Sequence, residues 1–449
     1  MAEKSLVVFA RLQEDFVPAG RLVLNETAAG VDASTFAYGT RYLERPGAFE
    51  VDPVSLSIPD RQAARGMRFY PRNGLTQFGG VRDCAPDAWG RRVIEARKRV
   101  PANSLPESTY LLEAGSDRIG ALDVRNHIGE PATEGVGVVR SLQYMLDTVE
   151  RIERGEPVPA HWTDLFGSGP GAGGARPKAS VRDETGLLWL AKFPSVSDTF
   201  DVALAEWATL RLARLCGMTV PEARTLDLGG RNCLLVRRFD RYWSASAEPT
   251  AEDIALHETV PRQDAAKEFS LPFVSGLTFV GCDEMESRLK GYDDLARAIR
   301  SYAHPSVIRA DNRELFTRMV FNILVSNDDD HLRNHAFVRD PRLTGWRLSP
   351  LYDVVPRPGV AFERFLHLQV GDEGKAATLD NALTRCAAFT LDRAQAVNLI
   401  ADVWSQVVQW RANFEAWRLP GKLVDQLAPA MRRLDEVASP KLQRELARG

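Results

Sequence analysis

The sequence predicts an α+β fold in which a strand-rich first part precedes a helix-rich second part. Short apolar segments separated by glycine and proline turns are typical of the chain before about residue 260, whereas apolar residues recur at helical spacing after it. A chain of 449 residues is long enough for two or three domains. We therefore expect three units, residues 1–150, 151–260 and 261–449, of which the last is mainly helical.

Composition narrows the class of protein. Hydrophobic residues make up 44% of the chain and charged residues 26%, which is typical of a folded water-soluble protein. The formal net charge of −3 gives no global attraction to nucleic acid or to a membrane surface. No stretch approaches the ~18 apolar residues that a membrane span needs. The five cysteines are scattered without C-x-x-C spacing, which favours free thiols in a reducing compartment. We expect a cytoplasmic protein without a membrane partner.

The first unit reads as short strands followed by a basic run. Residues 7–12 and 21–24 are brief apolar segments, which predict short strands. Residues 91–99 contain five arginines and lysines, which indicate either a nucleic-acid contact or a solvated helix face. The solvated face is favoured because Glu95 interrupts the run and no aromatic residue is interleaved with it.

The middle unit predicts two hairpins and a helix. Strand-like residues at 177–182 and 187–193 flank a glycine-containing turn, which predicts the first hairpin. Apolar residues recur at helical spacing over 204–215 and predict a helix. Two glycines are predicted to join residues 224–228 to residues 233–239 in the second hairpin.

The strongest chemical signal is the sequence Ser-Asn-Asp-Asp-Asp-His-Leu-Arg-Asn at residues 326–334. Phosphoryl transfer to a hydroxyl requires a carboxylate that takes the proton and oxygen ligands that hold Mg²⁺, and protein kinases supply both from a loop with the spacing D-x-x-x-x-N. Asp329 and Asn334 have this spacing. The alternative is a charged turn after a helix over residues 315–324, where Asn and Asp are common as caps.

Asp353 is the single acid in a second loop, between an apolar segment and Pro356. An aspartate here is ordinarily a turn or helix cap. Together with the first loop it is a candidate second ligand of Mg²⁺.

Glycines and lysines of the middle unit are candidates for binding phosphate. Residues 167–174 are rich in glycine, which lets backbone N–H groups approach phosphate oxygens, although a flexible linker has the same composition. Lys178 follows the glycines and Lys192 lies within an apolar strand. A lysine in such a strand is unusual without a charged partner, and Glu206 on the next helix is the candidate. The alternative is a lysine that reaches water at a sheet edge.

Several segments in order resemble one family. The first group is Phe36 to Gly39, Leu56 to Pro59 and Phe78 to Arg92, which includes Pro-Asp-Ala-Trp-Gly-Arg-Arg. The second group is Gly173 to Lys178, Lys192 to Pro194, Arg238 to Arg241, Asp329 to Asn334 and Leu348 to Asp353. Over nearly its whole length the chain resembles the HipA family of serine/threonine kinase toxins of type II toxin-antitoxin pairs.

The resemblance implies a two-lobed kinase-like fold, distantly related to lipid kinases. Residues 1–150 would form a strand-containing N-terminal subdomain, and residues 151–260 an N-lobe with the phosphate loop. Residues 261–449 would form a mainly helical C-lobe with the catalytic and metal-binding loops. A small-molecule or lipid kinase would fit the core equally well, but it would leave the match in the N-terminal subdomain unexplained.

The resemblance also implies roles for individual residues. Asp329 would be the catalytic base, Lys192 would hold the phosphates, and Asn334 and Asp353 would hold Mg²⁺. The residues expected around ATP are Gly173, Gly174, Ala175, Arg176, Pro177, Lys178, Lys192, Glu206, Arg237, Arg238, Phe239, His331, Asn334, Tyr352 and Asp353. Gly171 stands where many relatives carry an autophosphorylated serine, so Ser168 or Ser180 would have to replace it. Arg237 stands where some members have a glutamate near the adenine.

Family members arrest growth, a state associated with persistence, by phosphorylating a translation component such as an aminoacyl-tRNA synthetase. A HipB-like helix-turn-helix antitoxin neutralises them and joins them to operator DNA. The resemblance therefore implies an ATP- and Mg²⁺-dependent kinase with these partners. The alternative is a catalytically silent, kinase-like co-repressor in an antitoxin–DNA complex. The presence of Lys192, Asp329, Asn334 and Asp353 favours the active kinase.

Overall fold

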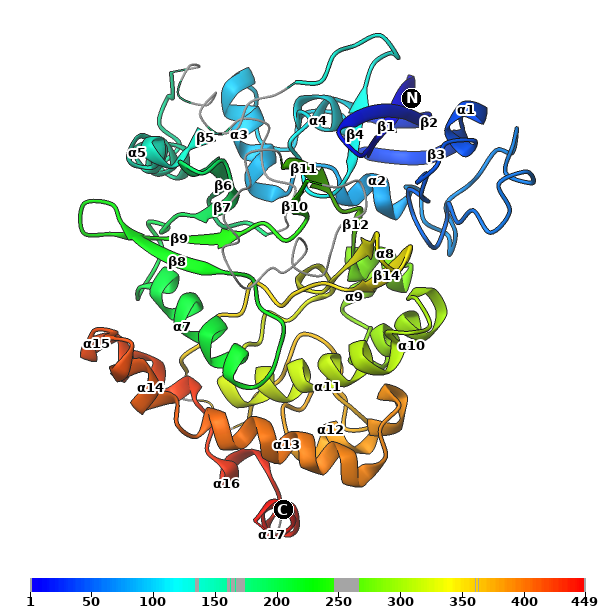
Figure 1. The fold of residues 1–449 in the computed structure, drawn as a ribbon. Helices are drawn as coiled ribbons and strands as arrows, with labels where there is room; N and C mark the ends of the chain where they lie inside the picture. The colour runs from blue at the N-terminus through cyan, green and yellow to red at the C-terminus, as the bar shows by residue number, and fades with distance from the viewer. Residues whose placement is uncertain are drawn as a thin grey trace.

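The computed structural model describes residues 2–133, 137–159, 162, 166, 174–245, 266–359, 361 and 363–447. Strands dominate one half of the molecule and helices the other, and the two ends of the chain lie at opposite extremes (Figure 1). The predicted α+β class is confirmed. The divisions expected near residues 150 and 260 stay predictions, and residue 260 itself lies outside the described part.

An antiparallel sheet opens the chain. Its strands β1 (Ala2–Leu12), β2 (Asp15–Thr27), β3 (Gly30–Tyr38) and β4 (Leu122–Arg125) lie in the order β3-β2-β1-β4. The prediction of short strands was wrong, because β1 has 11 residues and β2 has 13. Polar residues on the outer face extend both strands, while alternate residues such as Leu22 and Leu24 are buried. An apolar-run criterion misses the ends of such half-exposed strands.

Four helices complete this first part: α1 (Thr40–Leu43), α2 (Gly79–Asp83), α3 (Ala88–Lys98) and α4 (Glu107–Glu113). The Asp87 side chain accepts a hydrogen bond from Gly90 N and caps α3. The basic run lies on α3, where Arg91 pairs with Glu107 and Arg97 pairs with Glu113. Much of the run is therefore neutralised by α4.

The second sheet has the order β5-β6-β7-β9-β8. Its strands are β5 (Gly137–Val138), β6 (Lys178–Arg182), β7 (Leu188–Lys192), β8 (Ala223–Asp227) and β9 (Asn232–Arg237). Both predicted hairpins are present, as β6–β7 and β8–β9. Lys178 and Lys192 are directly opposite each other in the β6–β7 register, so both side chains lie on one face of the sheet. Helices α5 (Leu142–Glu153) and α7 (Val202–Leu215) accompany this sheet, and α7 confirms the predicted helix.

The C-terminal half is built around α11 (Ile308–Val325), which is buried on nearly every side over its last eleven residues and confirms the predicted helix. Helices α10 (Tyr292–Tyr302) and α13 (Arg393–Val407) pack against it (Figure 1). The remaining helices are α8 (Gly276–Val280), α9 (Glu284–Ser287), α12 (Leu379–Thr384), α14 (Trp410–Ala416), α15 (Gly421–Leu427), α16 (Leu434–Val437) and α17 (Pro440–Leu446). The strands here are β10 (Arg241–Ser244), β11 (Lys267–Ser270), β12 (Phe273–Ser275), β13 (Ala336–Asp340) and β14 (Gly345–Leu348).

No helix within the described residues is both long and apolar enough to cross a membrane.

Buried polar contacts fix the first part of the chain against the rest. Asp83 at the end of α2 accepts hydrogen bonds from Ser275 N at 2.6 Å and from Thr278 Oγ1 at 2.6 Å. A Cβ at Gly79 would lie 2.4 Å from Thr278 Oγ1, so only glycine permits this approach. A second junction joins Asp240 to the Gly120 N–H at 2.7 Å. These contacts hold the N-terminal part beside the region where the predicted site residues converge.

Candidate active site

Lys192 is the centre of a buried group of charges. It ends β7, and its Nζ lies 2.6 Å from Glu206 Oε1 on α7 and 2.8 Å from Asp353 Oδ1. The Lys192 side chain is 12% exposed and that of Glu206 is 4% exposed. The pairing of strand lysine with helix glutamate is therefore present, and the alternative of a lysine at the sheet edge in water is wrong.

The pKa values of this group follow from burial and pairing. Burial alone would lower the pKa of Lys192, but the adjacent carboxylates of Asp353 and Glu206 outweigh it and raise that pKa. Burial opposes ionisation of Asp353, yet Lys192 and Lys178 hold its pKa well below the ordinary value. The pKa of Glu206 is raised, chiefly by burial. Lys192 is thus a cation and Asp353 an anion at neutral pH.

Asp353 has left-handed backbone geometry, with φ at 58°. This conformation is uncommon for a residue other than glycine and is typical of strained functional loops. The preceding residue, Tyr352, donates its hydroxyl to the Arg333 carbonyl at 2.7 Å and so links this loop to the loop of residues 326–334.

An apolar cavity extends from Lys192 and Asp353. Phe239 and Tyr352 lie there with ring centroids 5.5 Å apart, and Phe239 also contacts Phe273 at 6.3 Å. The lining residues are Ile119, Lys178, Leu190, Lys192, Val236, Arg237, Arg238, Phe239, Asp240, Phe273, Tyr352 and Asp353. The lining combines charged groups with aromatic rings, which suits a ligand that carries both phosphate groups and a flat ring.

The described part of the predicted phosphate loop begins at Gly174, which has φ at +100° and lies against the Lys178 ammonium group. Lys178 Nζ is 3.1 Å from Asp87 Oδ2, and both side chains are almost fully buried. Arg176 contacts both carboxylate oxygens of Asp198, at 2.7 and 2.6 Å. Gly173 lies outside the described residues, as do Ser168 and Gly171.

Two predicted loop residues are engaged in structural contacts. The Pro177 carbonyl accepts a hydrogen bond from Phe193 N at 2.9 Å. Ser180 is buried, and its Oγ accepts a hydrogen bond from Arg238 Nη1 at 3.0 Å. Ser180 is therefore a poor substitute for the missing loop serine.

Arg238 and Arg237 differ in what surrounds them. The Arg238 guanidinium is paired with Asp240 and donates to the carbonyls of Asp117 and Arg118 at 2.8 and 2.9 Å. This side chain joins the N-terminal part to β9, so only its backbone and stem are free to face a nucleotide. Burial lowers the pKa of Arg237, against the opposing effect of Glu222.

The loop of residues 326–334 exposes Asp329. Its side chain is 52% exposed and contacts Arg357 at 2.9 Å, while the neighbouring Asp328 contacts the same arginine at 3.2 Å. Asn334 Nδ2 donates to the Asp329 carbonyl at 2.6 Å, which fixes the D-x-x-x-x-N loop and leaves the amide oxygen for a ligand. His331 Nε2 lies 3.9 Å from Asp329 Oδ1.

Asp330, in contrast, is buried. It accepts hydrogen bonds from the Tyr292 hydroxyl at 2.6 Å and from His367 N at 2.7 Å. Burial raises the pKa of Asp330 to about 7, against the opposing effect of these donors. The three adjacent aspartates thus differ in environment, and Asp330 anchors the loop that presents Asp329.

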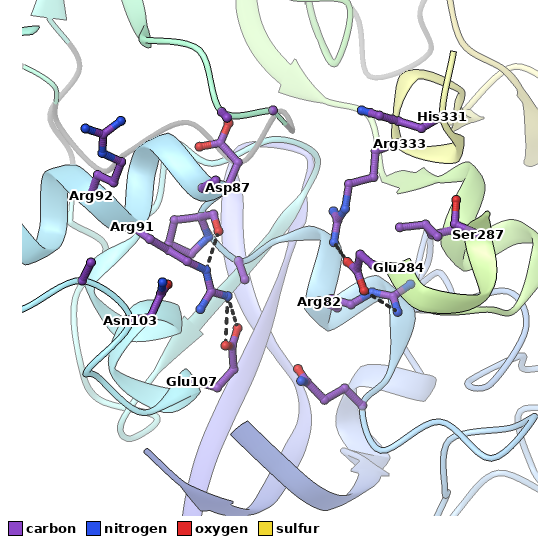
Figure 2. Close-up of a pocket in the computed structure, with 18 of the residues that line it drawn as sticks. Arg82, Asp87, Arg91, Arg92, Asn103, Glu107, Glu284, Ser287, His331 and Arg333 are labelled. Carbon is purple, nitrogen blue, oxygen red and sulfur yellow. Dashed lines mark hydrogen bonds and ion pairs between the residues drawn. The ribbon is translucent and has the colours of Figure 1, made fainter. Parts of the chain in front are cut away.

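A second, larger cavity of about 760 Å³ lies between α3 and the loop of residues 326–334. Figure 2 shows Asp87, Arg91 and Arg92 on one wall, and Arg82, Glu284, Arg333 and His331 on the other. Gly174 and Ala175 also line it. Of the predicted residues, Gly174, Ala175 and His331 line this cavity, and Lys178, Lys192, Arg237, Arg238, Phe239, Tyr352 and Asp353 line the apolar one. The linings of these two cavities do not include Arg176, Pro177, Glu206, Asp329 or Asn334.

Sequence reasoning did not assign Asp87, Ile119, Asp330 or Arg357 to the site. Asp87 lies in the Pro-Asp-Ala-Trp-Gly-Arg-Arg segment, and the structure shows that it caps α3. Nothing in the sequence indicated that Ile119 or Arg357 would reach the site.

Comparison with known proteins decides the family. The family of HipA-like C-terminal domains matches residues 171–411, more than half of the chain. The chain belongs to the HipA family. Two relatives from Sinorhizobium fredii, named "Putative kinase Y4mE" and "Putative kinase Y4dM", are 24% and 30% identical to this HipA-family chain over 355 and 343 residues. Each alignment covers 71% of this chain and 71% of the relative.

A solved structure shares the fold of this HipA-family chain. It is the HipA component of a Shewanella oneidensis complex of HipA, HipB and operator DNA, with a TM-score of 0.62 and 15% identity. The likeness covers 99% of this chain and 97% of that one. The predicted two-lobed kinase-like fold is confirmed.

Proposed function

We propose that this HipA-family chain is an ATP- and Mg²⁺-dependent protein serine/threonine kinase that acts as the toxin of a toxin-antitoxin pair. The observation that carries the proposal is the Lys192–Glu206–Asp353 group, with Nζ 2.6 and 2.8 Å from the two carboxylates. Kinases use such a lysine–glutamate pair to hold the nucleotide phosphates beside a metal-binding aspartate.

In the proposed reaction the acceptor hydroxyl oxygen forms a bond to the γ-phosphorus of ATP, and the bond between that phosphorus and the bridging oxygen of ADP breaks. The acceptor proton passes to Asp329, whose exposed carboxylate is open to a second protein. Lys192 and Lys178 neutralise phosphate charge, and Phe239 and Tyr352 border the adenine. Glu206 orients Lys192.

Asn334 and Asp353 fit the role of Mg²⁺ ligands. Oxygen is the ligand that Mg²⁺ prefers, and the hydrogen bonds of both side chains leave an oxygen free to bind: Oδ1 of Asn334 and Oδ2 of Asp353. The lowered pKa of Asp353 keeps its carboxylate ionised. Mg²⁺ at this position would offset the charge of the ATP phosphates.

The partners are proposed from the family. A HipB-like helix-turn-helix antitoxin would neutralise the kinase and hold it at operator DNA, since HipB and operator DNA accompany HipA in the Shewanella oneidensis complex. The phosphorylated protein would be a translation component such as an aminoacyl-tRNA synthetase, and phosphorylation in the cytoplasm would arrest growth.

The test is transfer of labelled γ-phosphate from ATP with Mg²⁺ into a bacterial lysate, with Asp329→Ala beside the wild type. We expect a labelled lysate protein with the wild type and none with the variant. Asp328→Ala is the matched control, because Asp328 is as exposed as Asp329 and contacts the same arginine. We expect this control to keep most of its activity.

If neither the wild type nor Asp329→Ala labels any protein while ATP still binds, the result would contradict the kinase proposal and favour the silent co-repressor. Label on the wild-type chain itself would reveal an autophosphorylation site.

A further inference from the structure

Two arginines in the larger cavity have no charged partner among the residues that the structure describes. Arg92 projects from α3, where its contact within the described residues is with the ring of Trp89, 5.6 Å away. Arg288 follows α9, is exposed, and forms no ion pair within the described part of the chain. Figure 2 shows that neighbouring arginines of the same cavity are instead paired, Arg91 with Glu107 and Arg333 with Glu284.

The cavity adjoins the proposed site of phosphoryl transfer. Gly174 and His331 line it, and His331 lies 3.9 Å from the Asp329 carboxylate. Burial and several neighbouring cations, Arg288 among them, lower the pKa of His367, whereas Asp329 opposes this effect. Arg288 and Asp329 thus both act on the His367 ring, which also lines the cavity.

We propose that this cavity binds the acceptor segment, and that Arg92 and Arg288 select protein segments with an aspartate or glutamate close to the phosphorylated hydroxyl. This inference rests on the proposed kinase function. An arginine without an internal partner forms charge-assisted hydrogen bonds with an incoming carboxylate, and complementary charge governs which partner binds. A cavity of about 760 Å³ has room for several side chains.

The surroundings favour a protein segment over a nucleic acid. Met285 and Leu289, on either side of Arg288, are 77% and 73% exposed and offer apolar contacts to a protein. The cavity lining within the described residues includes no phenylalanine, tyrosine or tryptophan, the large rings on which single-stranded bases stack.

The test uses the full-length protein with ATP, Mg²⁺ and a peptide library that carries a central serine or threonine and varied flanking residues. We expect the wild type to select aspartate or glutamate near the acceptor. In the Arg92→Glu/Arg288→Glu double variant we expect the KM for acidic peptides to rise about tenfold, and lysine-containing peptides to become the better substrates.

Arg309→Glu on α11 is the matched control, because Arg309 is exposed and does not line the cavity. We expect it to keep the acidic preference, and thermal melting will show that the variants are folded. The KM for ATP, measured in parallel, separates an acceptor site from a nucleotide site.

Three results would overturn the inference. These are a wild type without acidic preference, a double variant that keeps the preference, and a KM for ATP that rises as much as the KM for peptide. Displacement of acidic peptide by single-stranded RNA at equal concentration would reassign the cavity to nucleic acid. A wild type that hydrolyses no ATP and labels no peptide contradicts the kinase proposal itself, which distinguishes the two failures.

Discussion

The two sides of the candidate active site hold their charges in different ways. On the side proposed to bind the nucleotide, Lys192 and Glu206 are 12% and 4% exposed and are paired within the protein. On the side proposed to face the acceptor, Asp329 and Arg357 are 52% and 55% exposed and meet in water. The free-energy cost of removing the first group from water is therefore met when the protein folds and not when a ligand binds. This group is thus preorganised for one ligand. The hydrated second group stays available to a protein partner.

The largest expected effect follows from removing the buried cation. Lys192→Met leaves the carboxylates of Glu206 and Asp353 without their partner, so we expect the free energy of unfolding to fall by about 3 kcal/mol. Phosphoryl transfer should fall by about 100-fold or more. Urea unfolding and the labelled-phosphate assay measure the two effects. A variant as stable as the wild type would mean that the lysine is not essential to the buried group.

The next effect concerns the junction between the N-terminal part and Lys178, which follows the proposed phosphate loop. Asp87→Asn keeps an acceptor for the cap of α3 but removes the charge beside Lys178, 3.1 Å away and almost fully buried. We expect a loss of about 2 kcal/mol in the free energy of unfolding at pH 7. Asp198→Asn is a control, because the partner of Asp198, Arg176, is 39% exposed. We expect Asp198→Asn to lower the free energy of unfolding by less than half as much as Asp87→Asn does. Equal losses would contradict the importance of burial.

The raised pKa of Asp330 predicts that its contribution to stability depends on pH with a sign opposite to that of an ion-paired carboxylate. Its folded pKa of about 7 lies above the unfolded value near 3.9, so the folded state binds more protons between these pH values. The contribution of Asp330 to stability is therefore present at low pH and is lost as pH rises to about 7. We expect Asp330→Asn to destabilise the protein by about 1–2 kcal/mol at pH 5 and by less at pH 8.

Urea unfolding of wild type and Asp330→Asn at matched pH measures this difference. The contribution of His335 to stability has the opposite dependence on pH, because burial lowers the pKa of His335 to about 3. His335 is present in both proteins, so its contribution cancels when they are compared. A destabilisation by Asp330→Asn that grows with pH would contradict the prediction.

The smallest effect is expected on the acceptor side. Arg357→Ala removes contacts to Asp328 and Asp329 that are about half exposed, and such surface pairs contribute little. We expect the free energy of unfolding to change by less than about 0.5 kcal/mol. A loss above about 2 kcal/mol in urea unfolding would mean that the acceptor side is as preorganised as the nucleotide side.

The sequence could predict contacts that follow from local patterns, but not those between distant segments. The partnership of Lys192 with Glu206 was predictable because an isolated lysine in an apolar strand needs a partner and the next helix offered one. The spacing of Asp329 and Asn334 likewise predicted a shared loop. The pairing of Lys178 with Asp87 was not predictable, because the residues are 91 positions apart and no local pattern relates them.

Other features depended on tertiary packing. The approach of Arg357 to Asp329 depends on the path of the loop after Asp353, whose left-handed φ no sequence pattern indicated. The roles of Asp328, Asp329 and Asp330 could be separated by spacing, but only the fold shows that Asp330 is buried against Tyr292. Only the fold shows that α4 neutralises the neighbours of Arg92, while Arg92 itself has no ion pair in the described part of the chain.

The division between a nucleotide side and an acceptor side is tested most directly by the affinity for ATP. Isothermal titration of Mg²⁺-ATP into Asp329→Ala and Lys192→Met compares one inactive variant from each side. The account predicts that Asp329→Ala binds ATP within about twofold of the wild type, whereas Lys192→Met binds at least about tenfold more weakly. Wild-type affinity in Lys192→Met, or a comparable loss in both variants, would contradict it.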